Sequence, residues 1–239
     1  MDNFSIIPVV TLVFVVSFCL SVVIWSTRNF QMSYINRRGD LGAVQSSHSV
    51  PTPRLGGVAI VAALSLGSFL IPGDFGDATS LLLLCLAPLL SAGLWEDIGK
   101  GVSPRGRMAL AALSSLLVVA AFGIWVERVG VPAADWALGF APVGIAFTIF
   151  AVVGVTNAFN LIDGINGLCS GCAMMALLLI GFYSGLIYDS MLILLIGSMM
   201  GFLLFNLTIF GRRSVDLFNQ VKNTLVVIVI YRLVIKIFI

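Results

Sequence analysis

Charged residues are scarce in this sequence. Only 10% of its 239 residues are Asp, Glu, Lys or Arg, whereas 59% are hydrophobic and the mean hydropathy is +1.10. A soluble globular domain carries about 25% charged residues, so this composition excludes that class. The net charge of +2 is too small to indicate a nucleic-acid partner. The sequence therefore predicts a protein whose main solvent is lipid.

Histidine and cysteine are also rare, with one histidine and four cysteines. Cys169 and Cys172 form a C-x-x-C, but no thioredoxin-like βαβ pattern surrounds them, so we interpret them as small apolar residues of a helix. We find no internal repeat, which disfavours an inverted-repeat transporter. Gly- and Pro-interrupted helices favour a transporter, whereas helix centres lack charge before Arg232.

Long apolar runs dominate what remains. Because water is missing from the bilayer core, each crossing needs a helix of roughly 20 apolar residues. We predict an all-α polytopic integral membrane helix bundle with about eight transmembrane helices, forming a single domain over residues 1–239. The expected helices cover residues 5–25, 55–71, 79–94, 108–126, 138–156, 169–187, 190–209 and 224–239.

The loops between these runs differ in charge. Ten of the thirteen Lys and Arg residues fall in alternate loops, namely 27–54, 95–107, 157–168 and 210–223. Because cytoplasmic loops are enriched in basic residues, we expect these loops in the cytoplasm and the N-terminus outside.

The richest polar segment is N-A-F-N-L-I-D-G-I-N-G-L at 157–168. Asn157, Asn160 and Asp163 recur every three residues, so one turn of helix would place two amides and a carboxylate on roughly one side. Gly164 and Gly167 then allow a sharp turn. Amides bind sugar or base edges, and the carboxylate suggests a cation or a proton to move.

A second segment is H-S-V-P-T-P-R-L-G-G at 48–57. Arg54 offers a planar fork that suits phosphate, and two prolines stiffen the loop. The alternative is a helix-start loop with a topology-setting arginine. His48 gains weight as a ligand-binding residue only from these neighbours.

A third segment is W-E-D-I-G-K at 95–100. Glu96 and Asp97 can chelate one cation, or divide cation binding and base chemistry between them. Lys100 can pair with Asp97 or hold a phosphate. The alternative is a solvated loop of mutually screening charges. Together, the three segments predict a Mg²⁺-dependent phosphoryl-transfer site at the membrane surface.

Over residues 1–206, these motifs resemble those of the polyprenyl-phosphate N-acetylhexosamine-1-phosphate transferases. The segment at 157–168 looks like the family's N-x-x-N-x-x-D-G-x-D-G-L, and W-E-D-I-G-K is similar to its D-D-x-x-K or D-D-x-x-D. The resemblance implies an enzyme that moves an N-acetylhexosamine-1-phosphate from a UDP-sugar to undecaprenyl phosphate. UMP would be released and a lipid-linked glycan of the cell envelope, such as O-antigen, would be initiated.

The resemblance also implies roles for individual residues, with Mg²⁺ as the cofactor. The candidate catalytic carboxylates are Glu96, Asp97 and Asp163, and the last two would bind the metal. The candidate substrate-binding residues are His48, Arg54, Lys100, Asn157, Asn160 and Asn166. Expected partners are UDP-N-acetylhexosamine, undecaprenyl phosphate and membrane lipid in the bacterial inner membrane, with a homodimer left open.

This sequence departs from the family pattern at three places. Glu96 stands where the first aspartate is usual, and Asn166 replaces the second aspartate of the loop. The resemblance ends after Asn206, so residues 207–239 are an atypical tail for which we expect a truncated or frameshifted end. The alternative function is therefore a catalytically inactive, truncated family member that acts in membrane binding or assembly.

Overall fold

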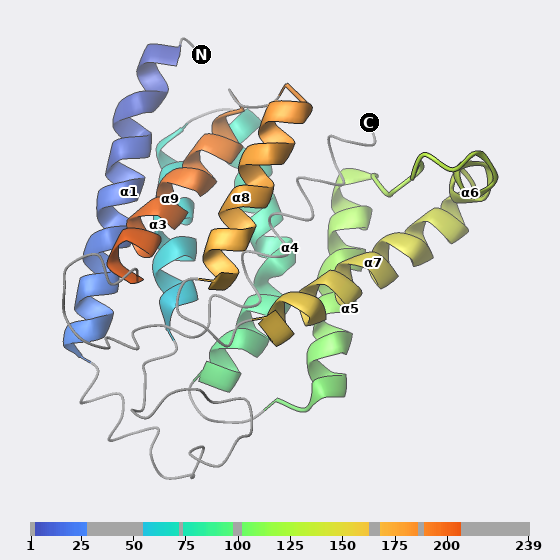
Figure 1. Ribbon diagram of the computed structural model, residues 1–239, viewed down its shortest axis with the longest axis horizontal. Coiled ribbons are helices and arrows are strands. Elements are labelled where there is room, and N and C mark those ends of the chain that lie inside the picture. The colour runs from blue at the N-terminus through green and yellow to red at the C-terminus, as the bar shows by residue number, and fades with distance from the viewer. Residues whose placement is uncertain are drawn as a thin grey trace.

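The computed structural model of the protein describes residues 3–27, 55–71, 74–97, 102–162, 168–185 and 189–206. Within these ranges all regular structure is α-helical, which confirms the predicted fold class for this part of the chain. Figure 1 shows the helices gathered in one bundle, most of them roughly vertical in this view and one crossing at a slant. They are α1 (Asn3–Ser26), α3 (Gly56–Leu70), α4 (Asp74–Asp97), α5 (Pro104–Phe122), α6 (Pro132–Leu138), α7 (Ala141–Ile162), α8 (Leu168–Tyr183) and α9 (Ser190–Asn206).

Four helices are long and apolar enough to cross a membrane. The qualifying segments are Ile6–Ser26, Gly76–Glu96, Pro104–Phe122 and Ala141–Phe159. The apolar helices α3, α8 and α9 have 15, 16 and 17 residues. At about 1.5 Å per residue they reach roughly 23–26 Å, less than the 30 Å hydrocarbon core.

Our expectation of about eight spans is thus only partly met. Three of the expected helices fall short of the length criterion, and the run at 224–239 lies outside the described residues.

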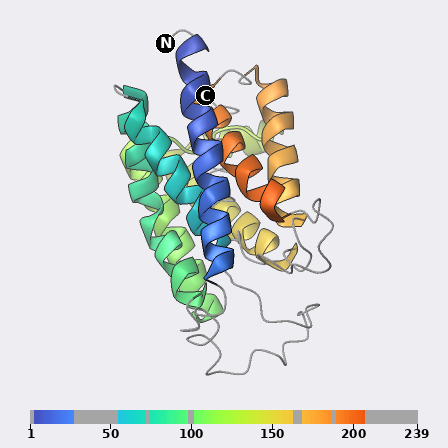
Figure 2. The same cartoon turned by 90° about the vertical axis from the view of Figure 1, so that its left-hand side faces the viewer.

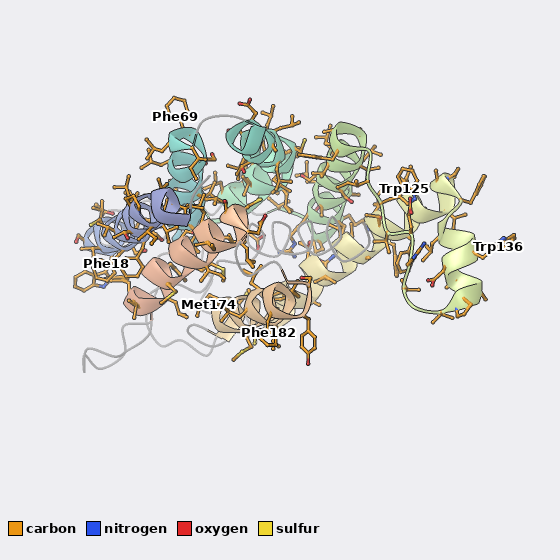
Figure 3. The ribbon with its side chains drawn as sticks, turned by 90° about the horizontal axis from the view of Figure 1, so that it is seen from above. Phe18, Phe69, Trp125, Trp136, Met174 and Phe182 are labelled. Atoms are coloured by element: carbon orange, nitrogen blue, oxygen red, sulfur yellow. The ribbon has the colours of Figure 1, made fainter. Side chains whose placement is uncertain are left out.

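The outer surface of the bundle is apolar, as expected for a multi-pass membrane protein. Phe69 and Trp136 are 84% and 86% exposed, and Figure 3 shows both side chains pointing outward from the bundle. Phe140 and Phe150 are also exposed. Such large apolar side chains would be unfavourable in water but are well solvated by lipid.

Helices α1, α3 and α9 form the most tightly packed group. Gly201 of α9 lies so close to α1 that a Cβ there would overlap the Phe14 carbonyl oxygen. Ser17 of α1 donates a hydrogen bond to the Ser198 carbonyl oxygen at 2.7 Å. Phe205 of α9 makes edge-to-face contacts with Phe18 and Trp25, with ring centroids 5.9 and 6.3 Å apart. Small residues and interhelical hydrogen bonds are how membrane helices approach closely.

Helices α4 and α5 form an antiparallel hairpin. Pro88 interrupts α4 internally, and the next residue, Leu89, donates its backbone N–H to Ser114 Oγ of α5 at 3.2 Å. One turn away, Cys85 Sγ lies 3.7 Å from the Leu117 carbonyl oxygen. These contacts fix the register of α4 against α5. Helix α5 also packs against α7, so it connects the hairpin to the rest of the bundle.

The predicted span at 138–156 is shifted in the structure. Leu138 ends the short helix α6, whose seven residues are too few to show a periodic pattern in the sequence. Helix α7 begins at Ala141, so Pro142 falls in its first turn and does not interrupt it. A Cβ at Gly144 would overlap the Trp125 ring, and Thr148 Oγ1 accepts a 2.9 Å hydrogen bond from the Val126 N–H.

Candidate functional site

The helix ends that carry the predicted site face the same end of the bundle. In Figures 1 and 2, the lower ends are the C-termini of α1, α4, α7 and α9 and the N-termini of α3, α5 and α8. Two of these ends carry motif residues: α4 ends at Asp97, and α7 includes Asn157 and Asn160. The loops after α1, α4 and α7, which the loop charges predicted to lie on one side, therefore all begin at this end of the bundle.

Helix α7 extends further into the polar segment than we predicted. The expected span ended at residue 156, whereas α7 continues to Ile162. Asn157 and Asn160 therefore lie within one turn of a regular helix, as their spacing suggested. The Asn157 side-chain amide donates to the Val153 carbonyl oxygen at 2.9 Å, and this hydrogen bond satisfies a polar group near the membrane. The amide oxygen of Asn157 retains its capacity to accept a hydrogen bond from a substrate.

Glu96 forms an ion pair that the sequence analysis missed. Arg107 Nη1 lies 2.9 and 3.2 Å from the two carboxylate oxygens of Glu96. The Arg107 and Glu96 side chains are only 13% and 23% exposed. The pair joins the last turn of α4 to the first turns of α5. The alternative interpretation, a solvated loop, does not hold for Glu96, because this residue belongs to α4 and its carboxylate is bound by Arg107 of α5.

The start of α5 explains how Arg107 reaches Glu96. Ser103 caps the helix by accepting the Gly106 N–H at 3.1 Å with its Oγ, and Pro104 occupies the first helical position. The Ser103 carbonyl oxygen also accepts the Arg107 N–H at 3.0 Å. Helix α5 therefore begins four residues earlier than the predicted run at 108–126, since a Ser-Pro pair is a helix-start signal. This signal, next to a basic residue, could have marked Arg107 in the sequence.

The other predicted site residues have no described side chain. His48, Arg54, Lys100, Asp163 and Asn166 lie outside the described residues, whereas Asp97 and Asn160 are placed only by their helices. Their proximity to one another therefore remains a prediction. Among the described residues, Glu96 contacts Arg107 and Asn157 bonds within α7, and α5 packs against both α4 and α7.

The chemistry of this end of the bundle fits a magnesium ion. Within the described residues no three His, Cys, Asp or Glu side chains gather into a metal site. However, the C-terminal ends of α4 and α7 present backbone carbonyls, and a helix C-terminus carries a partial negative charge that favours cations. The motif residues there supply carboxylate and amide oxygens, the ligand type that Mg²⁺ prefers.

Comparison with known proteins gives a consistent assignment. The model of glycosyl transferase family 4 matches residues 79–211, more than half of the chain. The chain is 27% identical over 186 residues to an undecaprenyl-phosphate alpha-N-acetylglucosaminyl 1-phosphate transferase of Yersinia pestis, covering 75% of this chain and 50% of that protein. It is 26% identical over 185 residues to the protein of that name in Escherichia coli K12, covering 75% and 49%.

A second group of relatives has a different name and activity. The chain is 32% identical over 174 residues to a phospho-N-acetylmuramoyl-pentapeptide-transferase of Listeria welshimeri, covering 65% of this chain and 53% of that protein. The chain spans about half the length of the curated relatives it matches. The resemblance inferred from the motifs is confirmed, and the chain belongs to glycosyl transferase family 4.

Proposed function

We propose that the protein transfers an N-acetylhexosamine-1-phosphate from a UDP-sugar to undecaprenyl phosphate and releases UMP. The supporting observation is that W-E-D-I-G-K at 95–100 and the polar segment at 157–168 both fall inside the family match. Both also meet the same end of the bundle, at the ends of α4 and α7. The product would be the first lipid-linked intermediate of O-antigen or another cell-envelope polysaccharide.

The reaction exchanges one phosphoanhydride bond for another. A phosphate oxygen of undecaprenyl phosphate attacks the β-phosphorus of the UDP-sugar. The bond between that phosphorus and the oxygen that bridges the α- and β-phosphates breaks, and the electron pair leaves with UMP. Because no carbon centre reacts, the protein's task is to align the phosphates and stabilise their charge.

The chain's own residues divide this task. Asp97 and Asp163 would hold Mg²⁺, which when bound neutralises negative charge on the diphosphate. The basic residues His48, Arg54 and Lys100 would face phosphate oxygens. The amides of Asn157, Asn160 and Asn166 would bind the sugar or the base. The lipid phosphate would enter from the membrane, since the bundle's apolar surface places its polar end at the interface.

The proposed location follows from the same arrangement. The protein would be a multi-pass protein of the bacterial inner membrane, with its N-terminus outside and the site in the cytoplasm, where UDP-sugars are made. The basic loops at the site's end of the bundle support this orientation.

The test is UMP release from purified protein in detergent. The assay contains undecaprenyl phosphate, Mg²⁺ and, in turn, each of a panel of UDP-N-acetylhexosamines. Release that needs the lipid and stops with EDTA would support the proposal and name the sugar. A folded, monodisperse sample that releases no UMP with any sugar would contradict it and favour the non-catalytic binding or assembly role.

A further inference from the structure

The Glu96–Arg107 ion pair has a role that metal binding does not explain. Both carboxylate oxygens of Glu96 lie within hydrogen-bond distance of one guanidinium nitrogen. Each carboxylate oxygen therefore already accepts a hydrogen bond from the guanidinium, and the positive charge of Arg107 weakens the attraction of Glu96 for a cation. Since both side chains are mostly shielded from solvent, breaking the pair would leave a charge poorly compensated.

The pair is supported from both sides. On α5, the Ser103 cap and Pro104 fix the backbone that carries Arg107. On α4, the hydrogen bond between Leu89 and Ser114 holds the hairpin in register further into the membrane. The ion pair is the third contact between α4 and α5, after Leu89–Ser114 and Cys85–Leu117, and it is the one nearest the polar end. It therefore determines where the last turn of α4 lies relative to α5.

Asp97 is the next residue of that same turn. Its backbone position is coupled directly to that of Glu96, because the two residues share a peptide bond in a regular helix. The Arg107 charge also offsets the negative charge of Glu96, the first of the two adjacent acids. Glu96 is thus bound to the neighbouring helix, and Asp97 is the acid of this turn that the proposed function assigns to the metal.

We infer that Glu96 and Arg107 form a positioning pair that holds Asp97 in place for the transferase reaction, and that Glu96 is not a metal ligand. This inference rests on the proposed function. It also gives a reason for the extra methylene of Glu96, since a longer side chain reaches across to the neighbouring helix. Arg107 becomes a functional residue of this site through its effect on α4.

Exchanging the two charges separates positioning from metal binding. The variants are Glu96→Arg, Arg107→Glu and the double variant Glu96→Arg/Arg107→Glu. Each single variant places two like charges together, and we expect UMP release to fall about 100-fold, the effect of a small misplacement in a transferase site. The double variant restores an opposite-charge pair, and we expect it to recover at least about tenfold over either single variant.

The same exchange at Glu127 and Arg128, which are exposed and adjacent at the other end of the bundle, is the matched control. We expect it to leave UMP release unchanged. Because an arginine at position 96 cannot bind Mg²⁺, recovery in the double variant would come from the restored pair alone. A double variant that is folded but no more active than Glu96→Arg would overturn the inference.

A milder variant covers the case in which the charge exchange prevents folding. Glu96→Gln keeps an oxygen for Arg107 but loses the charge that would bind a metal. We expect its kcat to fall, with the Mg²⁺ concentration for half-maximal UMP release unchanged. An increase of about tenfold in that concentration would identify Glu96 as a metal ligand and overturn the inference. A wild-type protein without UMP release would instead contradict the proposed function itself.

Discussion

The α1–α3–α9 group and the α4–α5 hairpin are held together by different kinds of contact. The first relies on close backbone approach at Gly201, a hydrogen bond from Ser17 and a cluster of aromatic rings. The second relies on polar contacts spaced along its length, ending in the Glu96–Arg107 pair. The difference suggests a division of labour. The first group would supply stability by close packing, and the hairpin would position the residues to which we assign the chemistry.

The largest effect is expected at the proposed metal-binding acids, Asp97 and Asp163, where substitution should lower activity and leave stability nearly unchanged. Asp97→Asn and Asp163→Asn should each lower UMP release by about 100-fold or more, because each removes a charge that stabilises the reacting phosphates. Thermal unfolding in detergent should change little. Glu127→Gln, at the other end of the bundle, is the control. A variant at 97 or 163 with normal UMP release would remove that residue from the mechanism.

In the α1–α3–α9 group, substitutions should lower stability more than they lower activity. Gly201→Ala adds a methyl group where the α1 backbone already lies, so we expect a loss of about 1–3 kcal/mol in stability through overpacking. Gly154→Ala is the matched control, because no atom lies within 4 Å of the added Cβ. Thermal unfolding in detergent would compare the two. Equal stability changes in both variants would show that the α1–α9 approach is not tight.

A smaller effect is expected inside the hairpin. Ser114→Ala removes the acceptor of the buried Leu89 N–H, and we expect a loss of about 1–2 kcal/mol. Ser91→Ala is the control, since the Ser91 hydroxyl is exposed and bonds within its own helix to Pro88. If the hairpin positions the site, Ser114→Ala should also reduce UMP release more than Ser91→Ala. The reverse order would contradict the division of labour.

The smallest effect is expected at the serine that joins α1 to α9. Ser17→Ala removes its hydrogen bond to the Ser198 carbonyl oxygen, and interhelical hydrogen bonds in membranes contribute about 0.6 kcal/mol on average. A shift in the unfolding temperature should be just measurable. Ser26→Ala, whose hydroxyl bonds within α1 and is exposed, should produce no shift. A loss above about 2 kcal/mol in Ser17→Ala would mean that hydrogen bonding, more than backbone contact, stabilises this group.

Hydropathy was sufficient to predict most of the helices but not their ends. The end of α7 was missed because Asn157 and Asn160 are poor helix formers that suggested a loop, whereas in the fold they continue a helix already nucleated by its apolar part. The helix α6 was missed because its seven residues make only about two turns, too short for a periodic pattern. Apolar composition therefore locates a span more reliably than it locates the boundary with the headgroups.

The ion pair could not be predicted for a different reason. Glu96 and Arg107 are eleven residues apart, and their contact depends on the register of two helices. That register is set by the contact between Leu89 and Ser114, which no motif marks, whereas the Ser-Pro signal of the α5 cap indicates only where α5 begins. The candidate catalytic residues, in contrast, stood out because polar groups are expensive near lipid and so are rare there.

The exposed aromatic residues near the start of α7 indicate how deeply the protein would lie in the membrane. Trp and other aromatic rings settle at the level of the lipid headgroups, so Trp136 and Phe140 would mark one boundary of the hydrocarbon layer. Asn157 and Asn160 lie 16 and 19 residues after Ala141, where α7 begins, which is about 24–29 Å along the helix and close to the layer's thickness of about 30 Å. With the start of α7 at one boundary, the two amides would therefore lie near the other, where a water-soluble sugar nucleotide and a lipid-borne phosphate can meet.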